Sequence, residues 1–409
     1  MSDRTDADGI AAASRPAVVR LIVARGLRGF ADGFVAVLLP AYLLALGHDK
    51  FDVGILSTAT LAGSALATLA VGAFGHCWPS RRLLQGAALV MACTGAAFAG
   101  LTSFWPLLLV AFVGTLNPSS GDVSVFLPLE HARLAGTASG HARTALFARY
   151  SLAGSLSAAV GALAAGVPTW LAAHAGVPFA AGLRGMFGLY GAVGLAVWML
   201  YRSLPRDSGG PRSVPAPLGP SRAVVVRLAA LFSVDSFAGG LVVNSLLSLW
   251  LLDRFGVSLV QAGTFFFVTG LLSAASQLAA PWVARRIGLL NTMVFTHIPA
   301  NLCLVAAAFA PTLPLALVLL FARSALSQMD VPTRTAFVMA VVTPAERAAA
   351  ASFTAVPRSL ASAASPALAG ALMAAGWLAA PLVACGILKV AYDLAVLVAF
   401  RRVPLPGED

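Results

Sequence analysis

The sequence predicts an all-α integral membrane protein with twelve transmembrane helices, arranged as two pseudo-symmetric bundles of six. Three observations carry this prediction: a composition poor in charge, a series of long apolar segments and an internal repeat. Of the 409 residues, 59% are hydrophobic and only 11% are charged, whereas an average soluble domain has roughly 25% charged residues. So little charge cannot cover a soluble fold of this length, and so apolar a chain is not intrinsically disordered.

Twelve segments of the sequence are long and apolar enough to cross a membrane as helices. A transmembrane helix needs about 20 consecutive, mostly apolar residues, and none of these segments has the period-two alternation of a β-barrel strand. Glycine and proline inside them are compatible with membrane helices, where both are frequent. The segments lie at about 18–46, 53–76, 83–101, 105–129, 144–167, 181–201, 225–252, 258–283, 288–310, 313–341, 348–374 and 377–400.

The distribution of arginine predicts the orientation of the chain. One set of alternate connections carries most of the arginine behind the formal net charge of +11, whereas the opposite set holds little beyond Lys50, Arg184 and Arg254. Because positive residues stay on the cytoplasmic side, we expect a multi-pass protein of the inner (plasma) membrane with both termini in the cytoplasm. The positive charge therefore reflects topology, and no nucleic-acid partner is expected.

Polar segments divide the predicted helices into two bundles. Residues 204–224 are rich in Pro, Gly, Ser and Arg and lack an apolar period, which is typical of a linker. The first residues contain no apolar stretch of the kind found in a signal peptide. The predicted organisation is a cytoplasmic tail at 1–17, six-helix bundles at 18–203 and 225–402, a cytoplasmic linker at 204–224 and a cytoplasmic tail at 403–409.

The two bundles repeat each other in sequence. The segment Phe30–Val35 matches Phe237–Val242 at an offset of 207 residues. An offset that stays within two residues across several helices indicates an internally duplicated fold. Further matches, at offsets of 208 and 209, are Asp122 with Asp330 and Arg149 with Arg358.

The loop after the second predicted helix carries a recognisable pattern. It begins at Gly72 and ends at Arg81 and Arg82, with His76 between them. Together with twelve spans and a central linker, this pattern resembles the major facilitator superfamily of transporters, whose loop signature is Gly-x-x-x-Asp-Arg-x-Gly-Arg-Arg. The glycine and the arginine pair are kept, whereas His76 replaces the acid and one extra residue is present. The family motif is thought to latch one conformation, and the alternative here is a tight turn held by positive-inside charges.

The resemblance implies two bundles that rock around a substrate held near the membrane midplane. In that family, the first, fourth, seventh and tenth helices line the central cavity, and the second, fifth, eighth and eleventh form the interface between the bundles. An ionised residue at the bilayer centre costs at least about 2.5–3.5 kcal/mol unless it has a partner or water. Four acidic residues fall one each on the cavity-lining helices: Asp32, Asp122, Asp235 and Asp330.

Asp32 is the predicted proton-coupling residue, with Asp235 as the second candidate. A carboxylate in a partly dry cavity can bind and release a proton during a transport cycle. Asp32 lies near the middle of its helix and is followed by Gly33, which permits a close approach of a neighbouring helix or a ligand. Its repeat counterpart is Gly239, so duplication alone does not explain the carboxylate.

The remaining charges within the spans are expected to form a network that has a gating role or only fixes helix packing. We expect the repeated acid–base pairs Asp122 with Arg149 and Asp330 with Arg358, and such buried pairs are compatible with a purely structural role. The predicted charge network consists of Arg25, Arg28, Asp122, Glu130, Arg149, Asp330, Arg334 and Arg358.

Polar residues on the outer helices have simpler explanations. Lys389 and Asp393 are four residues apart, so we expect them to neutralise each other on one helix. His297 and Asn301 lack a third ligand, so no metal site is predicted, and no cofactor is expected. The residues predicted to line the substrate cavity are Phe34, Tyr42, Asn117, Ser120, Asn244, Ser248, Trp250 and Gln328.

These observations predict a monomeric secondary transporter in the lipid bilayer that moves a small organic solute by alternating access, coupled to protons. The excess of arginine within the spans leaves room for an anionic substrate, because arginine binds carboxylate and phosphate groups bidentately. An enzyme is not expected, since the sequence has no HExxH, GxSxG or clustered His. The alternatives are a uniporter, an exporter of lipophilic compounds or lipids with the same fold, and a non-transporting membrane sensor.

Overall fold

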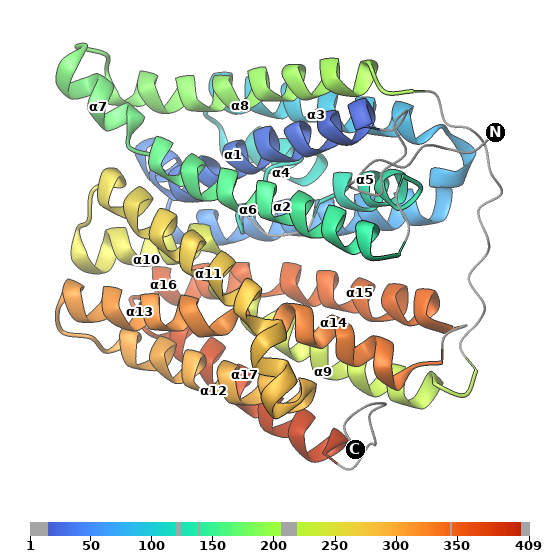
Figure 1. Ribbon diagram of the computed structural model, residues 1–409. Helices are drawn as coiled ribbons and strands as arrows, with labels where there is room; N and C mark the ends of the chain where they lie inside the picture. Colours follow the sequence, from blue (N-terminus) through green and yellow to red (C-terminus); the bar gives the residue numbers. More distant parts are fainter. Residues whose placement is uncertain (1–14, 120–123, 138–139, 206–218, 344–345, 402–409) are drawn as a thin grey trace. The chain divides into compact units, whose positions relative to one another are not determined.

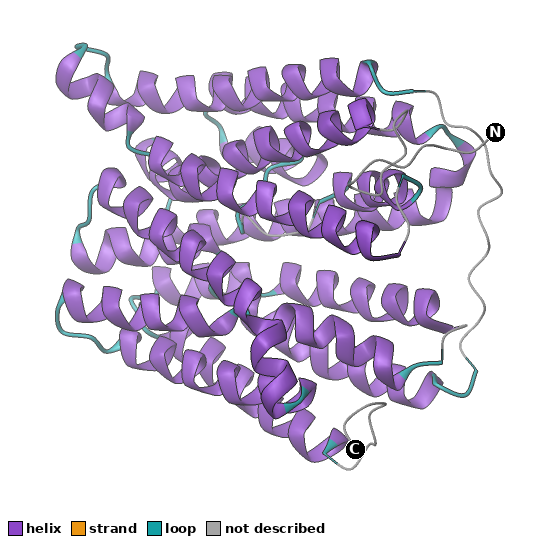
Figure 2. Ribbon diagram, viewed as in Figure 1, coloured by secondary structure: helices purple, strands orange, loops and turns teal. Residues whose placement is uncertain are grey.

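The computed structural model describes residues 15–119, 124–137, 140–205, 219–343 and 346–401. In these ranges the regular structure is helical, and Figure 2 shows the helices joined by short loops. A helix satisfies its backbone hydrogen bonds internally, which is what a chain in a hydrocarbon environment requires. The predicted all-α fold class is confirmed.

The helices follow one another along the chain as Figure 1 labels them. The first part of the chain forms α1 Arg15–Ala45, α2 Lys50–Phe74, the 3-10 helix η2 Gly75–Cys77, α3 Ser80–Gly100, α4 Phe104–Val113, α5 Phe126–Ala135, α6 Gly140–Ala164, α7 Val167–His174 and α8 Phe179–Arg202. The second part forms α9 Arg222–Gly240, α10 Asn244–Phe255, α11 Leu259–Ile287, α12 Leu289–Ala308, α13 Leu313–Ser327, α14 Asp330–Val341, α15 Arg347–Ala364, α16 Pro366–Ala374 and α17 Ala380–Phe400.

Each predicted segment contains helix in the structure. In the described part of the chain, ten spans are long and apolar enough to cross a membrane. Three of these join two consecutive helices, namely α6 with α7, α9 with α10, and α13 with α14. The other two segments hold shorter helices, α4 with α5 and α15 with α16. The helices therefore fit the predicted twelve-span architecture.

Proline marks several interruptions of the spans. The segment 105–129, expected as one helix, ends as α4 at Val113, and helix resumes as α5 at Phe126. Pro118 lies between the two helices. Pro332 lies in the first turn of α14, and Pro366 opens α16. Proline has no amide hydrogen to donate and clashes with the preceding helical turn, so a helix tolerates it best at its start.

The chain forms two compact units. Unit 1 comprises Met1–His48, Ala59–Pro211 and Ser258–Phe267, and unit 2 comprises Asp49–Thr58, Arg212–Val257 and Val268–Asp409. The first turns of α2 belong to unit 2, where Ser57 Oγ lies 3.2 Å from Ser245 Oγ. The first turns of α11 belong to unit 1, where Gly263 packs closely against Ala162.

Glycine brings α1 and α6 into close contact in unit 1. A Cβ atom added to Gly33 would lie 2.0 Å from the carbonyl oxygen of Ala158, and one added to Gly161 would lie 2.0 Å from that of Phe30. Small residues allow helix backbones to approach in this way, which is how many membrane helices associate. The space that a side chain at position 33 would need is therefore filled by the backbone of α6.

The same pairing recurs in unit 2. There α9 packs extensively on α15, and α12 packs on α17, as α1 packs on α6 and α3 on α8 in unit 1. Gly240, the repeat counterpart of Gly33, lies against the carbonyl oxygen of Ser362, which would be 2.3 Å from an added Cβ. Each unit thus pairs its first span with its fifth and its third with its sixth, as an internal duplication requires.

Candidate functional site

A buried carboxylate, Glu130 of α5, is the centre of the polar contacts in unit 1. Its side chain is fully buried and accepts hydrogen bonds from the hydroxyls of Tyr150 on α6 and Tyr201 on α8, the second over 2.7 Å. Arg28 of α1 forms a salt bridge with the same carboxylate and lies 4.1 Å from the ring centroid of Phe126. A buried charge needs such partners, and this one joins four helices.

Asp32 lies about one turn beyond Arg28 on the same face of α1. Its carboxylate is buried, takes a hydrogen bond from the side chain of Asn117 and lies within electrostatic range of Arg25 and Arg28. Asn117 belongs to the non-helical stretch between α4 and α5, so the break in that span brings an amide to the carboxylate. The structure thus joins two residues that the sequence assigned separately to coupling and to the cavity.

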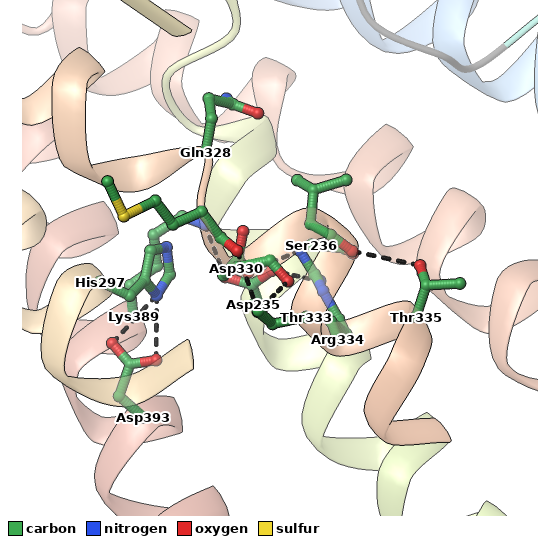
Figure 3. A network of polar contacts seen from close by, with 12 residues as sticks. Asp235, Ser236, His297, Gln328, Asp330, Thr333, Arg334, Thr335, Lys389 and Asp393 are labelled. Carbon is green, nitrogen blue, oxygen red and sulfur yellow. Dashed lines mark hydrogen bonds and ion pairs between the residues drawn. The ribbon is translucent and has the colours of Figure 1, made fainter. Parts of the chain in front are cut away.

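Asp235 of α9 holds two cations in the interior of unit 2, as Figure 3 shows. Lys389 Nζ on α17 lies 2.5 Å from Asp235 Oδ1, and Arg334 Nη1 on α14 lies 3.0 Å from Asp235 Oδ2. Arg334 also binds Asp330, one turn earlier on α14, over 2.7 Å. These two acids and two bases compensate one another in charge.

A histidine and an aspartate form a separate pair beside this group (Figure 3). His297 Nδ1 on α12 lies 2.9 Å and 3.0 Å from the two carboxylate oxygens of Asp393 on α17. His297 is 4% exposed and Asp393 is 2% exposed. The imidazole therefore faces the whole carboxylate in a setting that excludes water.

Two expected pairings differ in the structure. Lys389 does not pair with Asp393 on its own helix, because each finds a partner on a neighbouring helix, Asp235 and His297 respectively. Asp330 pairs with Arg334, which lies four residues later on the same helix and needs no second helix to reach it. Arg358, the expected partner, donates from Nε to Ser236 Oγ over 3.3 Å.

The aromatic residues predicted for the cavity lie in packed regions of their units. The Tyr42 ring centroid is 4.6 Å from that of Phe187 on α8. Trp250 is buried on α10, with its ring centroid 5.4 Å from that of Phe255. Phe34 is buried on α1.

The predicted polar cavity residues are spread over several elements. Asn244 opens α10, and Ser248 is buried on the same helix. Gln328, between α13 and α14, accepts a hydrogen bond from Gln277 over 3.4 Å. Asn117 contacts Asp32 as described, and Arg149 of the predicted charge network lies on α6. Ser120 and Asp122 lie outside the described residues.

The predicted loop motif surrounds η2. Gly72 is exposed near the end of α2, and His76 lies within η2, its side chain outside what the structure describes. Arg82 helps to line a cavity of about 480 Å³ in unit 1, together with Trp78. Arg81 instead donates to a carbonyl group at the end of α8.

Three arginines gather at the carboxyl end of α8. The last carbonyl groups of a helix lack intrahelical donors, and cations are favourable at that end of the helix dipole. Only Arg81 belonged to the predicted motif; Arg20 and Arg133 were missed because they come from other parts of the sequence. The donors and acceptors are Arg20 to Ser203 O (2.7 Å), Arg81 to Arg202 O, and Arg133 to Pro205 O (3.3 Å).

In unit 2 a carboxylate, Glu346, binds backbone amides at the amino-terminal end of a helix, whereas the three arginines bind carbonyl groups at a carboxyl end. It accepts hydrogen bonds from the backbone amides of Gly219 and Ser221, just before α9, and from the Thr343 hydroxyl over 2.7 Å. Hydrogen bonds from the hydroxyls of Ser221 and Thr343 and from the Gly219 amide lower the pKa of Glu346 from 4.5 to about 2. Hydrogen bonds to the charged form of a carboxyl have this effect.

The tyrosines that bind Glu130 were not predicted. All five tyrosines of the chain are buried, and a buried tyrosine hydroxyl usually finds a hydrogen-bond partner. Because this apolar sequence has so few tyrosines, each of their hydroxyls could have been examined as a partner for a buried carboxylate. They are Tyr42, Tyr150, Tyr190, Tyr201 and Tyr392.

No group of three or more His, Cys, Asp or Glu side chains in the described ranges is placed to hold a metal ion. The carboxylates and basic side chains of the two buried clusters can bind ions, and their titratable groups can bind and release protons. Intramembrane charges of this kind occur mostly on ion or substrate pathways.

Comparison with known families supplies the context for these clusters. The family model described as Major Facilitator Superfamily matches residues 21–327 of the chain. The chain belongs to this superfamily. It is therefore a multi-pass membrane protein.

Individual proteins are similar over most of the chain. An uncharacterized membrane protein of Saccharomyces cerevisiae, YJR124C, is 22% identical over 355 residues, which cover 78% of this chain and 79% of that protein. The structure of a bacterial homolog of the human lysosomal transporter Spinster, in an inward-facing and occupied conformation, has a TM-score of 0.74 at 16% identity and covers 94% of this chain and 96% of its own. A D-xylose–proton symporter has a TM-score of 0.73 at 16% identity, with 96% and 98% covered. At these identities the solved structures establish a common fold.

Proposed function

We propose that this member of the Major Facilitator Superfamily is a proton-coupled secondary transporter of a small organic solute. It exposes its substrate alternately to the two sides of the membrane, as transporters with repeated bundles do. The observation that carries the proposal is the buried Asp32 carboxylate on α1, set beside Arg25 and Arg28 and bound by Asn117. A structural neighbour that is a D-xylose–proton symporter supports proton coupling within this fold.

In this proposal Asp32 is the coupling residue and the arginines near it bias the site toward anions. Protonation removes the negative charge of Asp32, so an anionic group on the substrate meets less repulsion beside Arg25 and Arg28. Arginine is suited to this task because it binds carboxylate and phosphate with two parallel hydrogen bonds. Asp235, the second candidate, is held between Lys389 and Arg334, so we assign it to the charge network.

We also propose that the protein is a monomer in the inner (plasma) membrane. Both of its termini lie in the cytoplasm. The two bundles are taken as 18–203 and 225–402, with the linker at 204–224 between them. The positive-inside distribution of arginine supports this orientation.

The substrate class can be identified by a thermal-shift screen of solutes in detergent at several pH values. A ligand that binds only the folded protein stabilises it, and the effect grows with the free ligand concentration c as RT ln(1 + c/Kd). We expect a hit among small organic anions whose stabilising effect depends on pH in the native chain and becomes independent of pH in Asp32→Asn. Asp49→Asn, at an exposed acidic residue near the start of α2, is the matched control and should behave like the native chain.

Transport of that hit is then measured in proteoliposomes with and without a pH gradient. The native chain should accumulate the solute against its concentration gradient, whereas Asp32→Asn should lose accumulation but keep exchange of internal for external solute. Unchanged coupling in Asp32→Asn would overturn the assignment of this residue.

The same assay separates the alternative functions. A uniporter or an exporter of lipophilic compounds moves its solute regardless of the pH gradient and tolerates Asp32→Asn. A membrane sensor binds a ligand without any flux. Either result contradicts proton-coupled transport.

A further inference from the structure

The pair of His297 and Asp393 is chemically different from the other buried charges of unit 2. Asp235 and Asp330 are bound by Arg334, whose guanidinium stays charged in proteins, and Asp235 is bound by Lys389 as well. Asp393, in contrast, has an imidazole as its ion-pair partner among the residues that the structure describes. Histidine is the side chain whose charge changes most readily between about pH 5 and 8.

The charge balance depends on that imidazole. Asp235 and Asp330 cancel the charges of Arg334 and Lys389. The remaining pair is neutral when His297 carries a second proton and has a charge of −1 when it does not. Because neither side chain is open to water, the Asp393 carboxylate needs another cation beside it once the imidazole has lost its second proton.

Lys389 is the cation that can replace the imidazolium beside Asp393. It lies four residues before Asp393 on α17, so both side chains are on one face of the helix. In the structure it is bound to Asp235 of α9, which α17 contacts directly. The chain therefore offers this lysine two carboxylates on different helices, Asp235 and Asp393.

We propose that His297 and Asp393 form a proton-binding site whose occupancy is set by Lys389. When Lys389 binds Asp235, the proton is held by His297 and stabilised by Asp393. When Lys389 moves to Asp393, it replaces the imidazolium as the counter-ion, and His297 releases one proton to water. Asp235 then keeps Arg334 as its partner, and the net charge of the cluster falls by one, which equals the proton released.

This switch deepens the proposed function, on which it rests, because it links a proton to a helix of the cavity-lining set. A movement of α9 that separates Asp235 from Lys389 would release the proton, and binding of a proton would favour the reverse. The titratable and charged groups around the pair are Tyr392 and Lys389 on α17 and Asp235 on α9, and those around Lys389 and Asp235 are Cys385 on α17, Arg323 on α13, Asp330 and Arg334 on α14 and Arg358 on α15.

The test uses the proton itself as the ligand. The chain has six histidines, so nitrogen NMR of the full-length protein with labelled histidine, in detergent, gives a small set of ring signals. His297→Gln identifies the signal of His297. We expect this signal to change between the neutral and doubly protonated forms across about pH 5 to 9, and a signal that keeps one form throughout would overturn the proposal.

Two matched variants test the role of Lys389. Asp235→Asn frees the lysine, whereas Asp330→Asn removes a nearby negative charge but leaves the Lys389–Asp235 pair in place. We expect Asp235→Asn to reduce the proton affinity of His297 by about tenfold or more, and Asp330→Asn to have a clearly smaller effect. Equal effects would mean that only the electrostatic field matters and would overturn the switch.

A charge-compensated double variant controls for misfolding, and an exposed histidine serves as a reference signal. The double variant Asp235→Asn/Lys389→Met removes both charges of one pair, so it should fold, and His297 should then stay protonated to higher pH than in the native chain. The exposed His174, stacked on Trp170, should give the same signal in every variant. A double variant in which His297 titrates as in Asp235→Asn alone would contradict the switch.

Failure of this proposal can be told apart from failure of the proposed function. If transport is coupled to protons while His297 never changes its form, the switch is wrong and the transporter assignment stands. If His297 titrates as expected but no solute is moved, the proton site stands as a binding site and transport is wrong.

Discussion

The two units share a packing scheme but differ in how they hold buried charge. Unit 1 concentrates its contacts on Glu130, whose carboxylate is bound by Arg28 and two tyrosines. Unit 2 spreads its charges over α9, α12, α14 and α17, with Asp235 shared between two cations and a separate pair of His297 and Asp393. The partners of Glu130 all converge on one carboxylate. In unit 2, by contrast, Arg334 binds two carboxylates, so its acids and bases can pair in more than one way.

This difference shows that two repeats with the same helix packing can hold different buried charges. The common part is the close contact of the first and fifth spans, at Gly33 in unit 1 and Gly240 in unit 2. The part that differs is the chemistry held on that scaffold. After duplication, helix packing constrains both copies in the same way, but each copy is free to acquire its own charged residues.

The largest effect is expected from breaking the shared charge of unit 2. Asp235→Asn leaves Lys389 and Arg334 with less negative charge than they need, and loss of one partner of a buried ion pair typically costs about 3–5 kcal/mol. Adding Lys389→Met should recover much of that loss, because it removes the uncompensated cation. Thermal unfolding in detergent measures both variants, and a double variant no more stable than the single one would contradict the pairing.

The next effect is expected where the two units are alike. Gly33→Ala adds a Cβ atom 2.0 Å from the carbonyl oxygen of Ala158, so α1 and α6 must separate. Overpacking against backbone should cost about 3 kcal/mol. The control is Gly72→Ala, where no atom lies within 4 Å of the added Cβ and the change should be neutral or slightly stabilising. Similar unfolding temperatures for the two variants would show that the close contact is not rigid.

Tyrosine hydroxyls should separate the two clusters. Tyr201→Phe removes a hydrogen bond of 2.7 Å to the Glu130 carboxylate, and such bonds to charged groups contribute about 1.5 kcal/mol or more. Tyr392→Phe in unit 2 should be nearly neutral, because the Tyr392 hydroxyl has no hydrogen-bond partner in the described part of the chain. Equal losses in the unfolding temperature would mean that the Glu130 cluster is no better satisfied than that of unit 2.

The smallest effect is expected at Glu346, outside the spans. Its pKa falls from 4.5 to about 2 in the folded protein, so its contribution to stability is present above about pH 4.5 and is lost as the pH falls toward 2. The native chain should therefore unfold at a higher temperature than Glu346→Gln at neutral pH, and this advantage should disappear in acid. A difference that does not depend on pH would rule out the ionised carboxylate as its source.

The fold was largely predictable because membrane helices leave a strong signal in sequence. Each apolar segment contains helix, and Pro332 and Pro366 lie at the starts of α14 and α16. The break around Pro118 was harder to predict, since the helix stops at Val113 and leaves residues such as Asn117 outside any helix. Hydropathy reports how apolar a segment is and not where its backbone stops being helical.

The candidate site was predictable in its membership but not in its pairing. Asp32, Arg28, Glu130, Asp235 and Arg334 were identified because charge within an apolar span is rare. Their partners depend on which helices touch, and this is not encoded in the spacing along one helix. Lys389 and Asp393 illustrate the limit: their spacing of four residues allows a local pair, yet each is drawn to a different neighbouring helix.

The close contact between α1 and α6 has a mechanical consequence for Asp32. Gly33 and Gly161 fit against carbonyl oxygens from opposite sides of the contact, so neither helix can slide or turn past the other without a collision. The Asp32 carboxylate, next to Gly33, therefore belongs to a rigid pair of helices, α1 and α6. We therefore expect any movement of α1 to carry α6 with it, so that Asp32 moves together with both helices.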